Sequence, residues 1–94
     1  MKTALSFDDV LLVPKYSEID TRSKITLSQE VKHVGHIRLP IISSPMDTVT
    51  EASMALKMHQ MGAFGIIHRY NTIQQQAELA REVVDQAGDC GAAI

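Results

Sequence analysis

Two short apolar segments of this chain are each followed by side chains that could bind a ligand. Ile41-Ile42 leads into Ser43–Asp47, and Phe64–Ile67 leads into His68–Asn71. The two polar segments carry hydroxyl, thioether, carboxylate, imidazole and guanidinium groups. In parallel α/β folds, binding groups gather at the carboxyl ends of the strands. The pattern therefore predicts ligand-binding groups at the ends of two strands.

The first polar segment leads into a stretch with helical spacing. Thr48 and Glu51 have the spacing of a capping box, which predicts a helix start at Thr48. Gly62 is a natural stop for that helix. Its apolar positions recur at helical spacing: Ala55, Met58 and Met61. Together with the strand Ile41–Ser44, which Pro45 should end because proline has no amide hydrogen, this makes one βα unit.

The second polar segment belongs to another βα unit. Phe64–His68 is apolar without alternation, as strands buried on both faces tend to be. Thr72 and Gln75 repeat the capping-box spacing, and the helix that they predict runs to Gly88. The apolar face expected for this helix comprises Ile73, Ala77, Ala80, Val84 and Ala87. Gly91–Ile94 then predicts the start of a third strand.

The residues before the first strand predict smaller elements. Leu5–Pro14 places two acids before an apolar run that proline stops, which predicts an extended or turn-like segment lying against something larger. Ile25–Leu39 alternates loosely around Gly35, which predicts a small, half-exposed hairpin. His33 and His36 are spaced like a metal pair, but no third ligand is nearby, so no metal site is expected.

The pattern predicts part of a larger α/β body. Two βα units and a strand start leave helix faces and sheet edges uncovered, because parallel strands need both faces packed. A (β/α)8 TIM barrel has about 250 residues, and this chain has 94. Residues 1–94 are therefore expected to be the N-terminal portion of one such domain, with no complete domain boundary inside the chain.

Composition and charge exclude several classes of protein. Hydrophobic residues make up 45% and charged residues 21%, which is ordinary for a globular protein. The net charge of -2 gives no electrostatic footprint for nucleic acid or anionic lipid. The apolar runs are far shorter than the roughly 18 residues that span a bilayer, and no signal peptide precedes them. A soluble, cytoplasmic protein without nucleic-acid or membrane partners is expected.

The single cysteine, Cys90, is expected to be a small packing residue. One cysteine excludes an internal disulfide and fits a reducing compartment. No histidine or basic residue lies beside it in the sequence to lower its pKa. Cys90 is therefore not expected to act as a nucleophile.

Three segments resemble the N-terminal part of inosine monophosphate (IMP) dehydrogenases and GMP reductases: SFDDVLLVPKYSEI, LPIISSPMDTVTEASMA and MGAFGIIHRYNTIQQQAE. They cover nearly the whole chain in the expected order and spacing. The resemblance implies a homotetrameric (β/α)8 barrel in which a cysteine on a later loop attacks C2 of a purine nucleotide. NAD or NADP then takes or gives the hydride, in the oxidation of IMP to XMP or the reduction of GMP to IMP.

The resemblance assigns two residues to the purine nucleotide. Ser44 and Met46 match positions after the first barrel strand that contact the bound nucleotide, with Met46 against the purine. A thioether is a soft platform for a flat base. By residue type alone Met46 would more often be core filler. Its place between Pro45 and Asp47 at a strand end, together with the resemblance, favours binding.

Three further residues match cofactor contacts of GMP reductases. Thr21-Arg22 matches a Ser-Arg pair that those enzymes give to a neighbouring subunit's cofactor site, and Arg69 falls where they place a basic contact. Guanidinium groups bind pyrophosphate or a 2′-phosphate in a bidentate way. The alternative, two solvated surface arginines, is equally frequent. The role of Asp47 stays open, and His68 is either a rim residue or a satisfied structural group.

Some features of the family are missing or altered. Family members usually have two glycines where this chain has Gly62-Ala63. The regulatory CBS modules of most dehydrogenases are expected to be absent, because Gln86–Asp89 leads directly into Cys90–Ile94, which resembles the strand on the far side of that insertion. No catalytic residue is expected in this chain. The reactive cysteine, the site for a monovalent cation such as K+, the phosphate-binding glycines and the flap are expected beyond residue 94.

Two choices stay open at this point. Thr21-Arg22, Arg69 and the missing modules favour the reductase, whereas SSPMDTVTE and GIIHRYN favour the dehydrogenase, and IMP oxidation with NAD is the preferred hypothesis. An alternative of another class is an inactive or split piece that folds only with a complementary chain.

Overall fold

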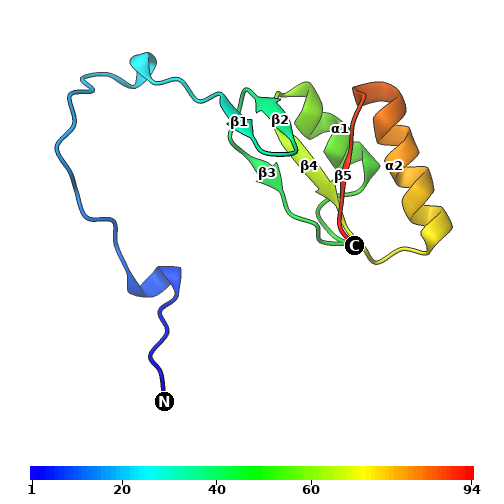
Figure 1. Cartoon of the computed structure of the whole chain (residues 1–94), viewed down its shortest axis with the longest axis horizontal. Coiled ribbons are helices and arrows are strands. Elements are labelled where there is room, and N and C mark those ends of the chain that lie inside the picture. Colours follow the sequence, from blue (N-terminus) through cyan, green and yellow to red (C-terminus); the bar gives the residue numbers. More distant parts are fainter.

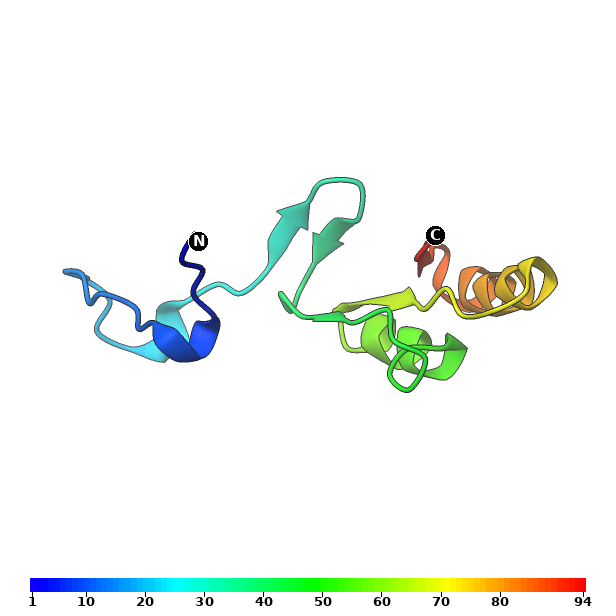
Figure 2. The same ribbon diagram turned by 90° about the horizontal axis from the view of Figure 1, so that it is seen from below.

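The computed structural model describes residues 1–94 as an extended N-terminal arm followed by a small α/β unit (Figure 1). In chain order the elements are two 3-10 helices at Phe7–Asp9 and Arg22–Lys24, β1 Gln29–Val31, β2 Gly35–Ile37, β3 Ile42–Ser43, α1 Ala52–Gln60, β4 Phe64–Ile67, α2 Ile73–Ala87 and β5 Gly91–Ala92. Figure 2 shows the arm and the α/β unit on opposite sides of the β1–β2 hairpin.

The α/β unit is built on a parallel sheet with the order β3-β4-β5. Ile42 pairs with Phe64 in one ladder, and Ile66 pairs with Gly91 in the other. Each neighbouring pair of strands is joined through a helix, as parallel strands require. This arrangement confirms the two predicted βα units and the start of a third strand.

Both helices pack on the same face of β4. The core cluster consists of Ala52 and Ala55 from α1, Ile67 from β4 and Val83 from α2. Ile67 is fully buried. Small residues on α1 allow the helix to lie close to the sheet. A Cβ added at Gly65 would lie 2.8 Å from the Cα of Ala55, so this glycine is part of the packing.

Helix α1 begins later than predicted. The prediction of a capping box formed by Thr48 and Glu51 is wrong. The helix starts at Ala52 with Glu51 as its N-cap residue, and the Glu51 side chain makes no capping hydrogen bond. Residues Asp47–Val49 form a turn instead. The Glu51 carboxylate is taken by a contact with His68, so a tertiary interaction overrides the local capping signal. The predicted stop is confirmed, since Gly62 has φ +81 directly after the helix.

Helix α2 has the predicted ends but a different buried face. Thr72 and Gln75 form the capping box, and Gly88 ends the helix in the left-handed conformation. The predicted apolar face is wrong for most of its residues, because Ile73 is 93% exposed and Val84 is 42% exposed. Ala87 packs inward as predicted, and Val83 and Leu79 pack inward in place of the others. The helix carries two apolar stripes, and sequence spacing alone does not tell which one meets the core.

The predicted hairpin is present as β1 and β2, which pair antiparallel with Val31 opposite Gly35. The strands are shorter than the alternation suggested, since Ile25 and Leu27 lie outside them and are exposed. Two residues near the turn have positive φ, His33 at 66° and Gly35 at 100°. A histidine in this conformation carries a steric cost that glycine does not.

We therefore expect His33→Gly to stabilise the hairpin. Relief of the left-handed conformation outweighs the added freedom of glycine in the unfolded chain, and we expect a gain of about 0.5 kcal/mol. Urea unfolding of the protein would measure the change. Lys32→Gly is the control, because Lys32 has no positive φ and should lose stability. A loss for both variants would contradict this prediction.

The N-terminal arm contains the predicted turn-like segment as the 3-10 helix Phe7–Asp9. The Ser6 backbone amide donates to the Asp9 carboxylate at 3.0 Å, and hydrogen bonds from Ser6 lower the pKa of Asp9. The apolar side chains of the arm are exposed, including Phe7 and Leu12 at 97% each. No part of residues 1–94 covers them, so the packing surface expected for this segment stays a prediction.

Candidate functional site

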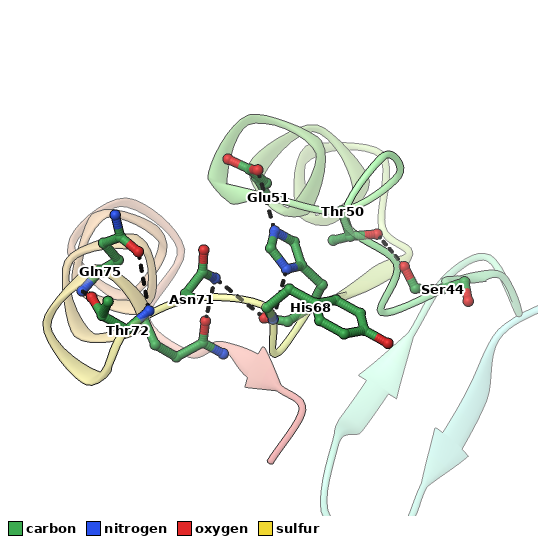
Figure 3. Close-up of polar contacts among 9 residues, drawn as sticks. Ser44, Thr50, Glu51, His68, Asn71, Thr72 and Gln75 are labelled. Carbon is green, nitrogen blue, oxygen red and sulfur yellow. Dashed lines mark hydrogen bonds and ion pairs between the residues drawn. The ribbon is translucent and has the colours of Figure 1, made fainter.

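Two loops meet at the carboxyl edge of the parallel sheet. The first loop, Ser44–Val49, follows β3, and the second loop, His68–Thr72, follows β4. Because β3 and β4 are parallel neighbours, their carboxyl ends lie at the same edge. Figure 3 shows polar contacts made by residues in and beside these loops. The predicted gathering of polar groups at two strand ends is therefore observed.

The first loop is a compact turn held by backbone hydrogen bonds. The Met46 amide donates to the Ser44 carbonyl at 2.8 Å. The Val49 and Thr50 amides both donate to the Met46 carbonyl, at 2.9 and 3.0 Å. The side chain of Met46 is 51% exposed. The loop therefore has a fixed backbone and presents a thioether to its surroundings.

Thr50 follows the first loop directly in the chain, and its side chain holds that loop by hydrogen bonds. The residue is 0% exposed. Its Oγ1 lies 2.7 Å from the Ser44 carbonyl oxygen and 2.9 Å from the Ser43 Oγ. The Thr50 hydroxyl is the donor in both contacts and shares its single proton between the Ser44 carbonyl oxygen and the Ser43 hydroxyl oxygen. The Thr50 carbonyl in turn accepts from the His68 amide at 3.2 Å. Thr50 thus links the ends of β3 and β4.

His68 is 2% exposed, and both of its ring nitrogens have partners. The Tyr70 amide donates to Nδ1 at 3.1 Å, so this nitrogen carries no proton. The proton therefore sits on Nε2, which lies 3.2 Å from the Glu51 carboxylate. The contacts fix the neutral tautomer of the ring. They support the second of the two hypotheses for His68, a satisfied structural group.

The second loop is held by its own polar contacts. The side-chain amide of Asn71 donates to Gln76 at 2.7 Å and to the His68 carbonyl at 3.4 Å. Arg69 is exposed, and its guanidinium carbon lies 5.4 Å from the centroid of the Tyr70 ring. The loop therefore presents a cation and an aromatic ring together at the carboxyl edge.

The structure brings some of the predicted site residues together and separates others. Ser44 and Met46 lie on the first loop, and Arg69 lies on the second loop at the same edge. Thr21 and Arg22 lie on the N-terminal arm, away from both loops (Figure 1). There Thr21 caps a 3-10 helix by accepting a hydrogen bond from the Ser23 amide. One chain does not place these two residues beside Arg69.

Thr50 and Glu51 were not identified from the sequence as site residues. Both Thr48 and Thr50 precede the same helix, and no local pattern shows which of them is buried. Thr50 is the fully buried one, with 0% exposure, and its carbonyl contacts the His68 amide at the end of β4. Glu51 was read as a capping residue, although its actual partner is 17 positions away in the chain.

The other histidines and acids do not assemble into a metal site. His36 Nδ1 lies 2.9 Å from the Glu30 carboxylate on the opposite strand of the hairpin. No group of three or more His, Cys, Asp or Glu side chains lies close enough to hold a metal ion. Asp47 is exposed on the first loop.

Cys90 packs against the core rather than facing the carboxyl edge. Burial raises the pKa of its thiol, and the neighbouring charge of Asp89 raises it further. A raised pKa lowers the fraction of reactive thiolate at neutral pH. The expectation that Cys90 is a packing residue agrees with its place in the core.

We expect Cys90 to react slowly with iodoacetamide at neutral pH. Its alkylation rate should be lower than that of the unfolded protein, because the raised pKa lowers the fraction of thiolate at neutral pH. The rate should rise as the pH is raised toward the pKa. Mass spectrometry of the native protein measures the rate, and the urea-unfolded protein is the control. Equal rates in the two states would contradict this prediction.

Comparisons with known proteins match nearly the whole chain. The family model of the IMP dehydrogenase / GMP reductase domain matches residues 4–90. An inosine-5'-monophosphate dehydrogenase from Nitrosopumilus maritimus is 54% identical over 76 residues, which cover 81% of this chain and 16% of that protein. One from Bacillus subtilis is 48% identical over 82 residues, covering 87% of this chain and 17% of that protein.

GMP reductases match as well. A GMP reductase from Leishmania donovani is 38% identical over 79 residues, covering 84% of this chain and 16% of that protein. A crystal structure of a GMP reductase from Trypanosoma brucei superposes with a TM-score of 0.74 at 36% identity, covering 88% of this chain and 18% of that one. The similarity therefore extends from sequence to fold.

The fold and the site define a parallel α/β unit that carries its polar loops at the carboxyl ends of neighbouring strands. The chain belongs to the IMP dehydrogenase / GMP reductase family. This confirms the resemblance found in the sequence. The chain spans about a sixth of the length of the curated relatives it matches. None of its helices has the length and apolar character needed to cross a membrane.

Proposed function

We propose that this chain supplies part of the active site of a purine-nucleotide oxidoreductase that oxidises IMP to XMP with NAD. In this proposal its βα units are the first two of a (β/α)8 barrel. The observation that carries it is the first loop, which stands at the carboxyl edge of the sheet within a region that matches the family model. Relatives at 54% and 48% identity are named as IMP dehydrogenases.

Ser44 and Met46 fit contact with a nucleotide. The Ser44 carbonyl is used within the loop by the Met46 amide and the Thr50 hydroxyl, whereas its side chain is exposed. The Met46 thioether is half exposed on a backbone that is fixed by hydrogen bonds. A polarisable group in this position suits the face of a flat base. We assign both residues to binding of the purine nucleotide.

The cofactor residues fit a dinucleotide only in part. Arg69 and the Tyr70 ring offer a cation beside an aromatic surface, which suits a phosphate near an adenine. Thr21 and Arg22 lie on the arm, apart from Arg69. We propose that they complete the site of a neighbouring subunit in a homotetramer. The nicotinamide cofactor, NAD or NADP, would supply hydride transfer.

We place the reactive groups outside residues 1–94. Cys90 is packed against the core with a raised pKa, so it does not serve as the nucleophile. No residue of this chain is assigned to catalysis or to the monovalent cation. A single cysteine fits a reducing compartment, and we propose that the protein is cytoplasmic.

The test is turnover by the complete protein that carries this chain. Formation of reduced nicotinamide with IMP and NAD, followed by absorbance and by chromatography of XMP, supports the proposal. Oxidation of NADPH with GMP would instead support the second candidate, GMP reductase. That candidate is favoured by the relatives that carry this name and by Thr21-Arg22. Turnover of neither pair would overturn both assignments.

A third candidate is a split piece that folds only with a complementary chain. It is favoured by the balance of apolar side chains, because twenty large hydrophobic residues are exposed and six hydrophobic residues form the buried core. Gel filtration of residues 1–94 alone, with and without the remaining part of the protein, discriminates this candidate. A stable, dispersed monomer would contradict it.

A further inference from the structure

The first and second loops are joined through three consecutive links. The Ser44 carbonyl accepts a hydrogen bond from the Thr50 hydroxyl at 2.7 Å. The Thr50 carbonyl accepts one from the His68 amide at 3.2 Å. His68 Nδ1 in turn accepts one from the Tyr70 amide at 3.1 Å. Each link passes through Thr50 or His68, which are 0% and 2% exposed. Figure 3 shows the contact of Thr50 with Ser44 and the contacts of the His68 ring.

Each of these contacts has at least one buried partner, Thr50 or His68, and this limits the access of water that could replace the contact. A buried carbonyl or amide that loses its partner costs more than the hydrogen bond itself contributes. The Ser44 carbonyl is shared between the Thr50 hydroxyl and the Met46 amide. Loss of the Thr50 hydroxyl would therefore loosen the turn that carries Met46.

His68 has two separable functions in this arrangement. Its Nδ1 holds the second loop through the Tyr70 amide, and its Nε2 reaches back to Glu51 at the start of α1. The His68 and Tyr70 rings also stack, with centroids 6.1 Å apart. Arg69 lies between these two residues in the sequence. The His68 side chain therefore fixes the position of the Arg69 backbone after β4.

We propose that Thr50 and His68 are positioning residues that hold the first loop, which binds the nucleotide, and the second loop, which binds the cofactor, as one unit. Thr50 fixes the positions of Ser44 and Met46, and His68 fixes the position of Arg69. This inference rests on the proposed function for the roles of the two loops. The coupling between the loops rests on the hydrogen bonds alone.

Thr50→Val removes the hydroxyl at nearly constant volume, and Thr50→Ser keeps it. In the complete protein we expect Thr50→Val to raise the KM for IMP about tenfold and the KM for NAD by a smaller factor of about threefold, because the second loop is coupled to Thr50 through His68. Thr50→Ser should restore the KM for IMP to within about twofold. Equal values for the two variants would overturn the role of the hydroxyl.

His68→Asn and His68→Gln separate the two ring nitrogens. An asparagine oxygen can replace Nδ1 as the acceptor for the Tyr70 amide, whereas a glutamine amide can replace Nε2 as the donor to Glu51. We expect His68→Gln to raise the KM for NAD about tenfold and His68→Asn to raise it less than about threefold. The same KM for both variants would contradict positioning through Nδ1. If Thr50→Val fails to fold, this pair carries the test.

Amide hydrogen exchange separates this inference from the proposed function. In Thr50→Val, exchange should accelerate about tenfold at Met46 in the first loop and also at Tyr70 in the second loop. Acceleration confined to Met46 would overturn the coupling, whether or not the protein turns over IMP. Absence of turnover by the wild type would count against the proposed function and would leave the exchange result to decide the coupling.

Discussion

Met46→Ala is expected to raise the KM for IMP about tenfold in the complete protein, with the KM for NAD changed less than about twofold. The thioether is 51% exposed at the carboxyl edge, and covering it with a purine would contribute about 1–1.5 kcal/mol. Alanine forfeits that contact and leaves the loop backbone intact. Steady-state kinetics with each substrate varied in turn measures the two constants.

Met61→Ala is the matched control. Met61 is 55% exposed, similar to Met46, but it follows the C-terminal end of α1 at the opposite edge of the sheet. Its replacement should leave both constants unchanged. Ser44→Ala should act in the same direction as Met46→Ala. A larger effect of Met46→Ala and Ser44→Ala on NAD than on IMP would contradict the assignment of these residues to the nucleotide.

Gly65→Ala is expected to lower the free energy of unfolding by about 1–3 kcal/mol. The added methyl group would lie 2.8 Å from the Cα of Ala55 and 3.0 Å from the Ser43 Oγ. Because the first of these atoms is backbone, α1 must move away from β4 to accommodate it. Urea or thermal unfolding of the complete protein measures the loss.

Ser53→Ala provides the control for helix α1, since Ser53 is exposed on that helix. Its replacement should change the free energy of unfolding by less than about 0.5 kcal/mol. If Gly65→Ala were as mild as this control, α1 would not pack on β4 as closely as the structure indicates.

Local sequence signals predicted the second βα unit more fully than the first. Thr72, Gln75 and Gly88 fixed the ends of α2 because capping and the left-handed stop depend on residues close in sequence. The same signal failed at Thr48, because the Glu51 carboxylate has a more distant partner in His68. Capping is predictable only where no tertiary contact competes for the side chain.

The buried face of α2 could not be predicted for a related reason. Val83 and Val84 are adjacent and equally apolar, yet Val83 is 3% exposed and Val84 is 42% exposed. The position of α1 decides which of them enters the core. Ile73 and Ala80 line an open groove of about 480 Å³ beside the end of β5, where the chain provides no covering element.

The sequence predicted the loops that carry the candidate site, but it did not predict the buried residues that hold those loops in place. Ser44, Met46 and Arg69 follow strands, so their placement at one edge follows from the parallel sheet. Thr50 and His68 support these loops through contacts that depend on the spacing of β3 and β4. The separation of Arg22 from Arg69 depends on the course of the arm, which has no sequence signature.

The most direct test of the central claim is the NMR signal of the Met46 methyl group during a titration of the complete protein with IMP. The claim that the first loop binds the purine nucleotide predicts a saturable shift of the Met46 signal and an unchanged Met61 signal. An unchanged Met46 signal at saturating IMP, or equal shifts at Met46 and Met61, would contradict it.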